Sequence, residues 1–141
     1  MVAEKGCRES LAEEVFVMMG DHVGYALKAC QRKGVQEVIL AGQFAKLLKI
    51  ACGHEQTHVS SSELDLSELA GWCSLLPETA CFEPLARQAN TARQVLEESA
   101  YNAALIELVC SNAKAAADKM APGLTVRVLL AGYNREVLYF A

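Results

Sequence analysis

The stretch over residues 15–58 constrains the fold of this chain more than any other part of its sequence. An apolar run at 15–18 leads to Gly20, and a second apolar run at 38–41 leads to Gly42. Apolar runs of this length are too short for a core helix and are typical of strands buried on both faces. Because residues at helical spacing follow each glycine, the stretch predicts strand, turn, helix, strand, turn and helix.

The limits of the first predicted helix follow from two residues. The Asp21 carboxylate can accept hydrogen bonds from the unpaired amides of the first turn, and Gly34 supplies a stop at the end. If the two strands are parallel, both glycine turns lie at the carboxyl ends of the strands, where open α/β sheets bind ligands. We therefore expect the functional site at this edge.

The rest of the chain predicts three more helices and two strands. The helices run from hydroxyl caps at 60–62 to Pro77, from an Asn90 cap over 91–100, and from an Asn102 cap over 103–120. A loop that contains Pro77 and Pro84 separates the first two of these helices. Strands are expected at 124–131 and 136–140, and the connection between them, 132–135, has the length and composition of a hairpin turn.

Together these elements predict an α/β fold: a three-layer, Rossmann-like domain whose mainly parallel sheet ends in a C-terminal antiparallel hairpin. The strands are placed at about 14–19, 36–41, 124–131 and 136–140. With 141 residues, of which 52% are hydrophobic, the chain can bury one core. We expect a polar lead-in at 1–13 and a single domain at 14–141.

Composition excludes several functional classes. A net charge of −4 disfavours a nucleic-acid partner, since the chain has no basic field for phosphate backbones. No segment approaches the ~18 apolar residues of a membrane span, and the charged N-terminus does not resemble a secretory signal, so a cytoplasmic location is expected. The six cysteines form no C-x-x-C pair and are interpreted as reduced, mostly buried thiols rather than a disulfide framework.

The turn from Gly20 to Gly24 combines glycines, which let a ligand approach the backbone, with a helix N-terminus that attracts anions. The alternative is that the glycines serve packing alone, and the residues leave these two readings at even odds. The turn is neither a G-x-G-x-x-G fingerprint nor a Walker sequence.

Two groups of polar residues follow the second turn. Lys46 and Lys49 share one helix face and could pair with carboxylates or phosphates, although a solvated face is the simpler alternative. His54, His58 and Cys52 are of types that ligate zinc, but Gly53 interrupts the helix and no other cysteine or histidine is near in sequence. We predict no metal site. Thr57 and His58 are instead expected as a polar pair at the edge of a site, with capping as the alternative.

The sequence of this stretch resembles the signature region of the CbiD family. The matching motifs are GDHVG at 20–24, Gly42, AKLLKIACG at 45–53 and QTH at 56–58, and they are followed by a similar helix start at Thr91-Ala92 and a final strand pair. Departures from the family pattern are Ala45 for glycine, Gln56 for asparagine before Thr-His, and VSS at 59–61 for the Ser-Arg that commonly follows. The resemblance covers essentially the whole chain.

The resemblance implies a function and a larger protein. Members of the CbiD family transfer the methyl group of S-adenosylmethionine to C1 of cobalt-precorrin-5B, a cobalt-corrinoid intermediate in anaerobic cobalamin biosynthesis. They are longer, with an additional N-terminal domain, so this chain is expected to correspond to the C-terminal domain. The competing hypothesis is a non-catalytic corrinoid- or nucleotide-binding or assembly module.

By the same resemblance, site residues are assigned to each ligand. The donor, S-adenosylmethionine, is expected at Gly20, Asp21, Gly24 and Gly42, and the corrinoid at Lys46, Lys49, Thr57 and His58. His58 is the candidate catalytic residue, and a dedicated general base is optional because the macrocycle itself activates the carbon nucleophile. A solitary domain would expose apolar surface, which favours a homo-oligomer.

Overall fold

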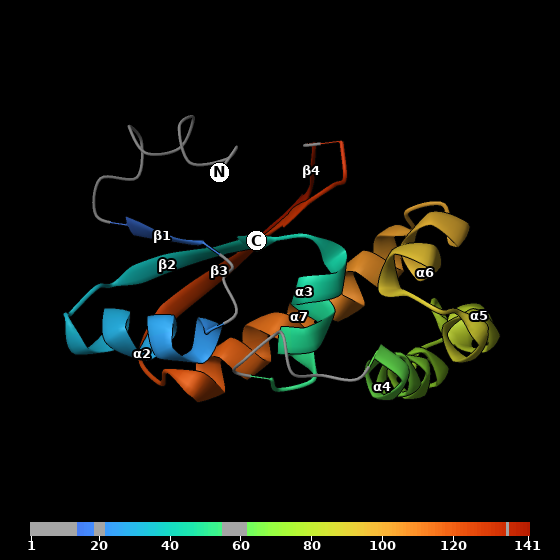
Figure 1. The fold of residues 1–141 in the computed structure, drawn as a ribbon, viewed down its shortest axis with the longest axis horizontal. Helices are drawn as coiled ribbons and strands as arrows, with labels where there is room; N and C mark the ends of the chain where they lie inside the picture. The colour runs from blue at the N-terminus through green and yellow to red at the C-terminus, as the bar shows by residue number, and fades with distance from the viewer. Residues whose placement is uncertain (1–13, 19–21, 55–61, 135) are drawn as a thin grey trace.

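The computed structural model describes residues 14–18, 22–54, 62–134 and 136–141 (Figure 1). The strands in chain order are β1 (Glu14–Met18), β2 (Glu37–Gly42), β3 (Thr125–Ala131) and β4 (Val137–Phe140). The helices are α2 (Val23–Arg32), α3 (Phe44–Ala51), α4 (Ser62–Ser74), α5 (Glu83–Gln88), α6 (Ala92–Glu98) and α7 (Ala103–Met120), with a 3₁₀ turn, η1, at Ala80–Phe82. The chain is therefore of the α/β class, as predicted.

The four strands form one mixed sheet in the order β1-β2-β3-β4. β1 and β3 both run parallel to β2, while β4 pairs antiparallel with β3 and completes the predicted hairpin. Leu40 of β2 is in register with Val17 on one side and Val128 on the other. Each strand agrees with its predicted range to within one residue at either end.

The three-layer, Rossmann-like arrangement is not confirmed. In Figure 1, α2, α3 and α7 all lie along one face of the sheet, and α4, α5 and α6 extend from the end where β2 leads into α3. The described residues thus form two layers. Hydrophobic periodicity identifies each helix but does not determine which sheet face the helix covers, and this explains the difference.

The core lies between the sheet and these helices. Side chains of a strand alternate between its faces, and Val38 and Leu40 of β2 are fully buried in the cluster that also contains Leu47 of α3 and Val109 of α7. α3 is held mainly by α7, and α7 also packs on β3. Because α3 is strongly amphipathic and its apolar face is buried, its polar face is fixed in direction relative to the sheet.

Glycines end two helices in the same way. Gly34 (φ 76°) follows α2, and Gly53 (φ 92°) follows α3. After α3, the Gly53 amide donates to the Ile50 carbonyl at 2.8 Å and the His54 amide donates to the Lys49 carbonyl at 3.2 Å. This pair of hydrogen bonds is the Schellman motif, in which glycine tolerates the left-handed conformation. The motif fixes the backbone of His54 beside the end of α3.

Capping residues confirm one helix start and correct another. The Asn102 side chain accepts from the Leu105 amide at 3.1 Å, so it caps α7 as predicted. Asn90 was the wrong cap for α6, since the side chain of Thr91 accepts from the Gln94 amide at 3.1 Å instead. Both residue types cap helices well, and local sequence does not distinguish neighbours that differ by one position.

The predicted loop around Pro84 contains structure that the sequence pattern did not indicate. α5 begins there, with Pro84 in its first turn and a Glu83–Arg87 ion pair of 2.8 Å along the helix. Proline is tolerated in a first turn because the amide it lacks would have no partner within the helix. The short helix is held against α4 rather than by its own propensity.

Candidate functional site

The carboxyl ends of the parallel strands lie at one edge of the sheet, as expected. Met18 pairs with Ala41, and Gly42 pairs with Leu130, so the ends of β1, β2 and β3 are neighbours. α3 begins directly after Gly42, at Phe44. At this edge the chain therefore passes from β2 into α3.

Only some of the predicted site residues can be placed. Gly20, Asp21, Thr57 and His58 lie outside the described residues. Gly24 is buried in the first turn of α2, two residues after His22, whose side chain makes no capping bond. Replacement of this buried glycine by a larger residue would disturb packing as well as any ligand contact. A loss of binding in a Gly24 variant therefore cannot be assigned to the ligand contact alone.

Tyr133, just beyond the end of β3, connects this edge to α6. The guanidinium of Arg93 stacks over the Tyr133 ring at 4.2 Å from its centroid and also bonds to Glu97 at 2.9 Å. Burial raises the pKa of the Tyr133 hydroxyl, while Arg93 and the backbone of Ala45 act in the opposite direction. The start of α6 is thereby held against the strand edge and the first turn of α3.

A cavity of about 200 Å³ lies between α3, α4 and α6, and we call it the α3–α4–α6 cavity. Its wall includes three charged side chains, one from each helix: Lys49, Asp65 and Arg93. The structure thus brings Lys49 into a cavity, whereas Lys46, also half-buried on α3, is not part of its wall. Apolar side chains and Thr91 complete the wall, which consists of Ala45, Leu48, Lys49, Asp65, Leu66, Thr91, Ala92 and Arg93.

Asp65 is the most unusual residue of this cavity. It is only 3% exposed, and its Oδ1 lies 2.9 Å from the Nε2 of His54. Its second oxygen, Oδ2, is buried and has no hydrogen-bond donor among the described residues. A buried acceptor without a partner costs ~1–3 kcal/mol, and more when it is charged. A buried acceptor of this kind calls for a donor from a bound molecule, an ordered water or another part of the protein.

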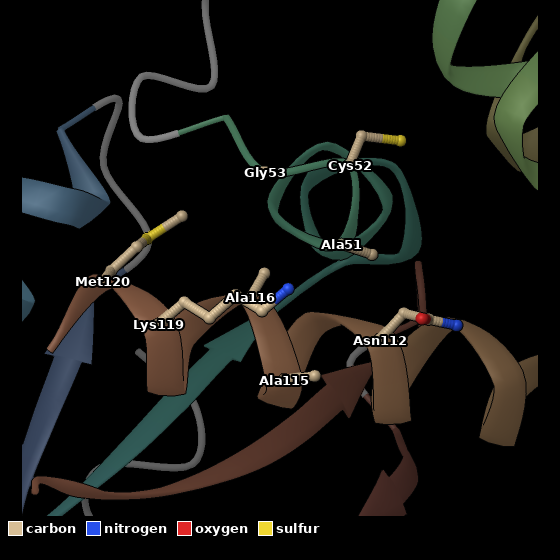
Figure 2. A pocket seen from close by; sticks show the side chains of 8 residues that line it. All are labelled: Ala51, Cys52, Gly53, Asn112, Ala115, Ala116, Lys119 and Met120. Atoms are coloured by element: carbon tan, nitrogen blue, oxygen red, sulfur yellow. The ribbon is translucent and has the colours of Figure 1, made fainter. Parts of the chain in front are cut away.

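Cys52 lies beside this carboxylate but is not an activated thiol. Burial, Glu68 and Asp65 all raise the pKa of its thiol far above the ordinary value. In Figure 2 its sulfur points away from α7. Cys52, His54 and Asp65 thus come together around the end of α3, yet the described residues contain no cluster of three or more cysteine, histidine or carboxylate side chains that could hold a metal ion.

Two other cavities have fewer charged side chains in their walls. One, of about 340 Å³, lies between the end of α3 and α7 and is lined mainly by small residues such as Ala51, Ala115 and Ala116, with Lys119 as its charged member (Figure 2). The other, of about 550 Å³, lies between α4 and α5, where Arg87 is its charged member. Neither is lined by a buried carboxylate.

The cysteine side chains allow a test of burial near the site. Burial raises the pKa of Cys73 to about 11 and that of Cys110 to about 12, whereas Cys81 is exposed. Because only the thiolate reacts, we expect iodoacetamide at mildly alkaline pH to modify Cys81 roughly 100-fold faster than Cys73 or Cys110 in the folded chain. Peptide mapping by mass spectrometry measures each rate separately.

A Cys81→Ser variant should lose this fast modification without a change in fold, and urea should make Cys73 and Cys110 reactive. Modification of all three at one rate in the folded chain would contradict the burial described here.

Sequence reasoning missed Asp65, Arg93 and Tyr133. For Asp65 a signal existed: it is spaced four and eight residues before Leu69 and Cys73, both fully buried, so it lies on the apolar face of α4. A carboxylate on a buried helix face calls for a partner. For Arg93 and Tyr133, which are 40 residues apart, the local pattern carried no signal.

Among the described helices, none combines the length and apolar character needed to cross a membrane.

Comparisons with known proteins match most of this chain to one family. The family model for the CbiD C-terminal domain matches residues 56–141. The cobalt-precorrin-5B C(1)-methyltransferase of Geobacter sulfurreducens is 64% identical over 132 residues, which cover 94% of this chain and 36% of that protein. The enzyme of that name from Geobacter sp. strain M21 is 61% identical over 132 residues, covering 94% of this chain and 37% of the relative.

A more distant relative with the same name, from Pseudomonas aeruginosa, is 37% identical over 107 residues, or 75% of this chain and 29% of its own length. No solved structure matches the chain. The chain spans little more than a third of the length of the two Geobacter relatives.

Proposed function

Because the chain belongs to the CbiD family, we propose that it is the C-terminal part of a cobalt-precorrin-5B C1-methyltransferase that uses S-adenosylmethionine in cobalamin biosynthesis. The observation that supports this most is the 64% identity to a relative of that name over 94% of the chain. The rest of such a protein, about two thirds of its length, would supply the N-terminal domain.

The donor site is proposed at the strand edge. The turn at 20–24 and Gly42 would let the donor approach the backbone closely, because glycine has no side chain to exclude it. Bound there, S-adenosylmethionine supplies an electrophilic methyl group. The residues present fit its charged amino-acid end, since Lys49 and the carboxylate-bearing Asp65 both line the nearby α3–α4–α6 cavity.

The acceptor site is proposed on the polar face of α3 and the segment after it. Lys46 and Lys49 are half-buried, and ammonium groups there can pair with the acetate and propionate chains of a corrinoid. Thr57 and His58 are proposed beside them. The task of these side chains is to hold the acceptor carbon in line with the methyl group, because proximity and orientation contribute much of the rate in such a transfer.

Several wider assignments are proposed rather than tested. A third layer is proposed on the face of the sheet opposite α2, α3 and α7. Ile39 and Leu129 belong to that face because strand residues alternate between faces, and they lie outside the core cluster. Phe140 is 39% exposed, so a further layer would have an apolar side chain to cover. The single-domain organisation, a homo-oligomer and a cytoplasmic location stay predictions.

The function is tested with a chimaera in which this chain replaces the corresponding part of the Geobacter sulfurreducens relative. We expect the chimaera to transfer a methyl group from S-adenosylmethionine to cobalt-precorrin-5B, detected by mass spectrometry as the gain of one CH₂ by the corrinoid. The unmodified relative, assayed in parallel, is the positive control. A chimaera that folds and binds corrinoid without any transfer would favour the alternative, a non-catalytic binding or assembly module.

A further inference from the structure

Two opposite charges line the α3–α4–α6 cavity, and the described part of the chain leaves both incompletely satisfied. Asp65 is 97% buried, and His54 occupies only one of its oxygens, so Oδ2 has no donor among the described residues. Lys49, on the facing helix, makes no ion pair within the described part of the chain. Arg93, by contrast, is engaged by Glu97 and by the Tyr133 ring.

The cavity is also large enough for a charged organic group. Its volume of about 200 Å³ far exceeds the space that one ordered water requires, which is on the order of 15 Å³. A buried carboxylate oxygen selects a donor that carries positive charge, and a lysine in the same wall selects a carboxylate. A group that bears both an ammonium and a carboxylate on one carbon matches the two sides of this wall.

We propose that the α3–α4–α6 cavity is a subsite for an α-amino acid group, with the ammonium bound by the Asp65 carboxylate and the carboxylate by Lys49. This inference rests on the proposed function in one respect: it assigns the group to the amino-acid end of S-adenosylmethionine. The cavity suits that assignment because Ala45 lines it and lies three residues after Gly42, within one turn of α3. Asp65 and Lys49 are thus specificity residues for the donor, and Lys46, which is not part of the cavity wall, is the lysine of α3 that remains proposed for the corrinoid.

The test compares three ligands by titration calorimetry with this chain, since every residue that lines the cavity belongs to it. S-Adenosylhomocysteine has both charged groups, its decarboxylated analogue has only the ammonium, and methylthioadenosine has neither. We expect the wild-type chain to bind S-adenosylhomocysteine roughly 10- to 100-fold more tightly than methylthioadenosine. Binding of the two at equal affinity, or no binding of S-adenosylhomocysteine, would overturn the subsite.

Variants assign each group separately. Lys49→Gln should weaken S-adenosylhomocysteine by roughly 10-fold but leave the decarboxylated analogue unchanged, because only the former has the carboxylate. Asp65→Asn should weaken both of these ligands and leave methylthioadenosine unchanged. Lys114→Gln, which removes an equal charge from an exposed ion pair on α7, should change none of the three. Equal losses for every ligand in Lys49→Gln would contradict the assignment.

Asp65→Asn is also examined by circular dichroism, because a buried residue can affect folding. Lys49 is only half-buried, so its variant keeps the inference falsifiable if Asp65→Asn unfolds. Failure of the proposed function would look different. If the chimaera transfers no methyl group while this chain still prefers S-adenosylhomocysteine in the pattern above, the subsite stands and the methyltransferase assignment falls.

Discussion

Replacing Phe44 with alanine should lower the free energy of unfolding by about 3–5 kcal/mol. Phe44 is the first residue of α3 and is fully buried in the core cluster. Its removal leaves a cavity that the surrounding strands and helices fill only in part, so the variant loses both burial and packing. Urea unfolding followed by circular dichroism measures the change.

A matched control is Leu75→Ala, which removes a large apolar side chain that is 77% exposed. Its effect should stay within about 0.5 kcal/mol. A Phe44→Ala variant as stable as Leu75→Ala would mean that α3 does not pack as described, and the positions of Ala45 and Lys49 beside the α3–α4–α6 cavity would then lose their support.

Methyl transfer by this chain alone should be at least ~100-fold slower than by the chimaera that adds the N-terminal part of a relative. The described cavities measure about 200, 340 and 550 Å³, which is below or in the lower half of the roughly 300–1,000 Å³ that sites for drug-sized ligands occupy. A corrin macrocycle with its carboxylate side chains is larger still. The chain can therefore offer one wall to the acceptor, and a misplacement of ~1 Å in an unenclosed site costs ~100-fold.

The measurement is single-turnover methyl transfer at matched protein concentrations, with donor and acceptor above their dissociation constants. Saturation separates weak binding from poor alignment, because only poor alignment lowers the rate at full occupancy. Equal single-turnover rates for the chain and the chimaera would show that this domain is the complete catalyst and that no second wall is needed.

Much of the fold was predictable because its signals are local. Short apolar runs placed all four strands to within one residue, and the hairpin followed from the turn at 132–135. Gly34 and Gly53 end their helices since they adopt the left-handed conformation that other residues avoid. Asn102 caps α7 through a bond to an amide only three residues away. In each case the residues that interact are close in sequence.

Elements that depend on packing were predicted less well. α5 is too short to be stable by propensity and exists because it packs against α4. In Figure 1, α2, α3 and α7 lie on the same face of the sheet. Which face a helix covers depends on the path that the long connections between strands take across the sheet. A pattern of apolar residues states that a helix has a buried side but not what buries it.

The features of the candidate site also divide into those that local sequence predicts and those that depend on packing. The sequence by itself predicted two buried strands that lead to Gly20 and Gly42, and it determined that Lys46 and Lys49 lie three residues apart and that the chain resembles the CbiD family. Only the tertiary structure decided that Lys49 and Asp65 line one cavity and that His54 holds Asp65 through one oxygen, while the other oxygen has no donor in the ranges that the structure describes. The reason is physical: a local motif fixes the conformation of a few consecutive residues, whereas the burial of a charge and its partners depend on how separate helices pack together.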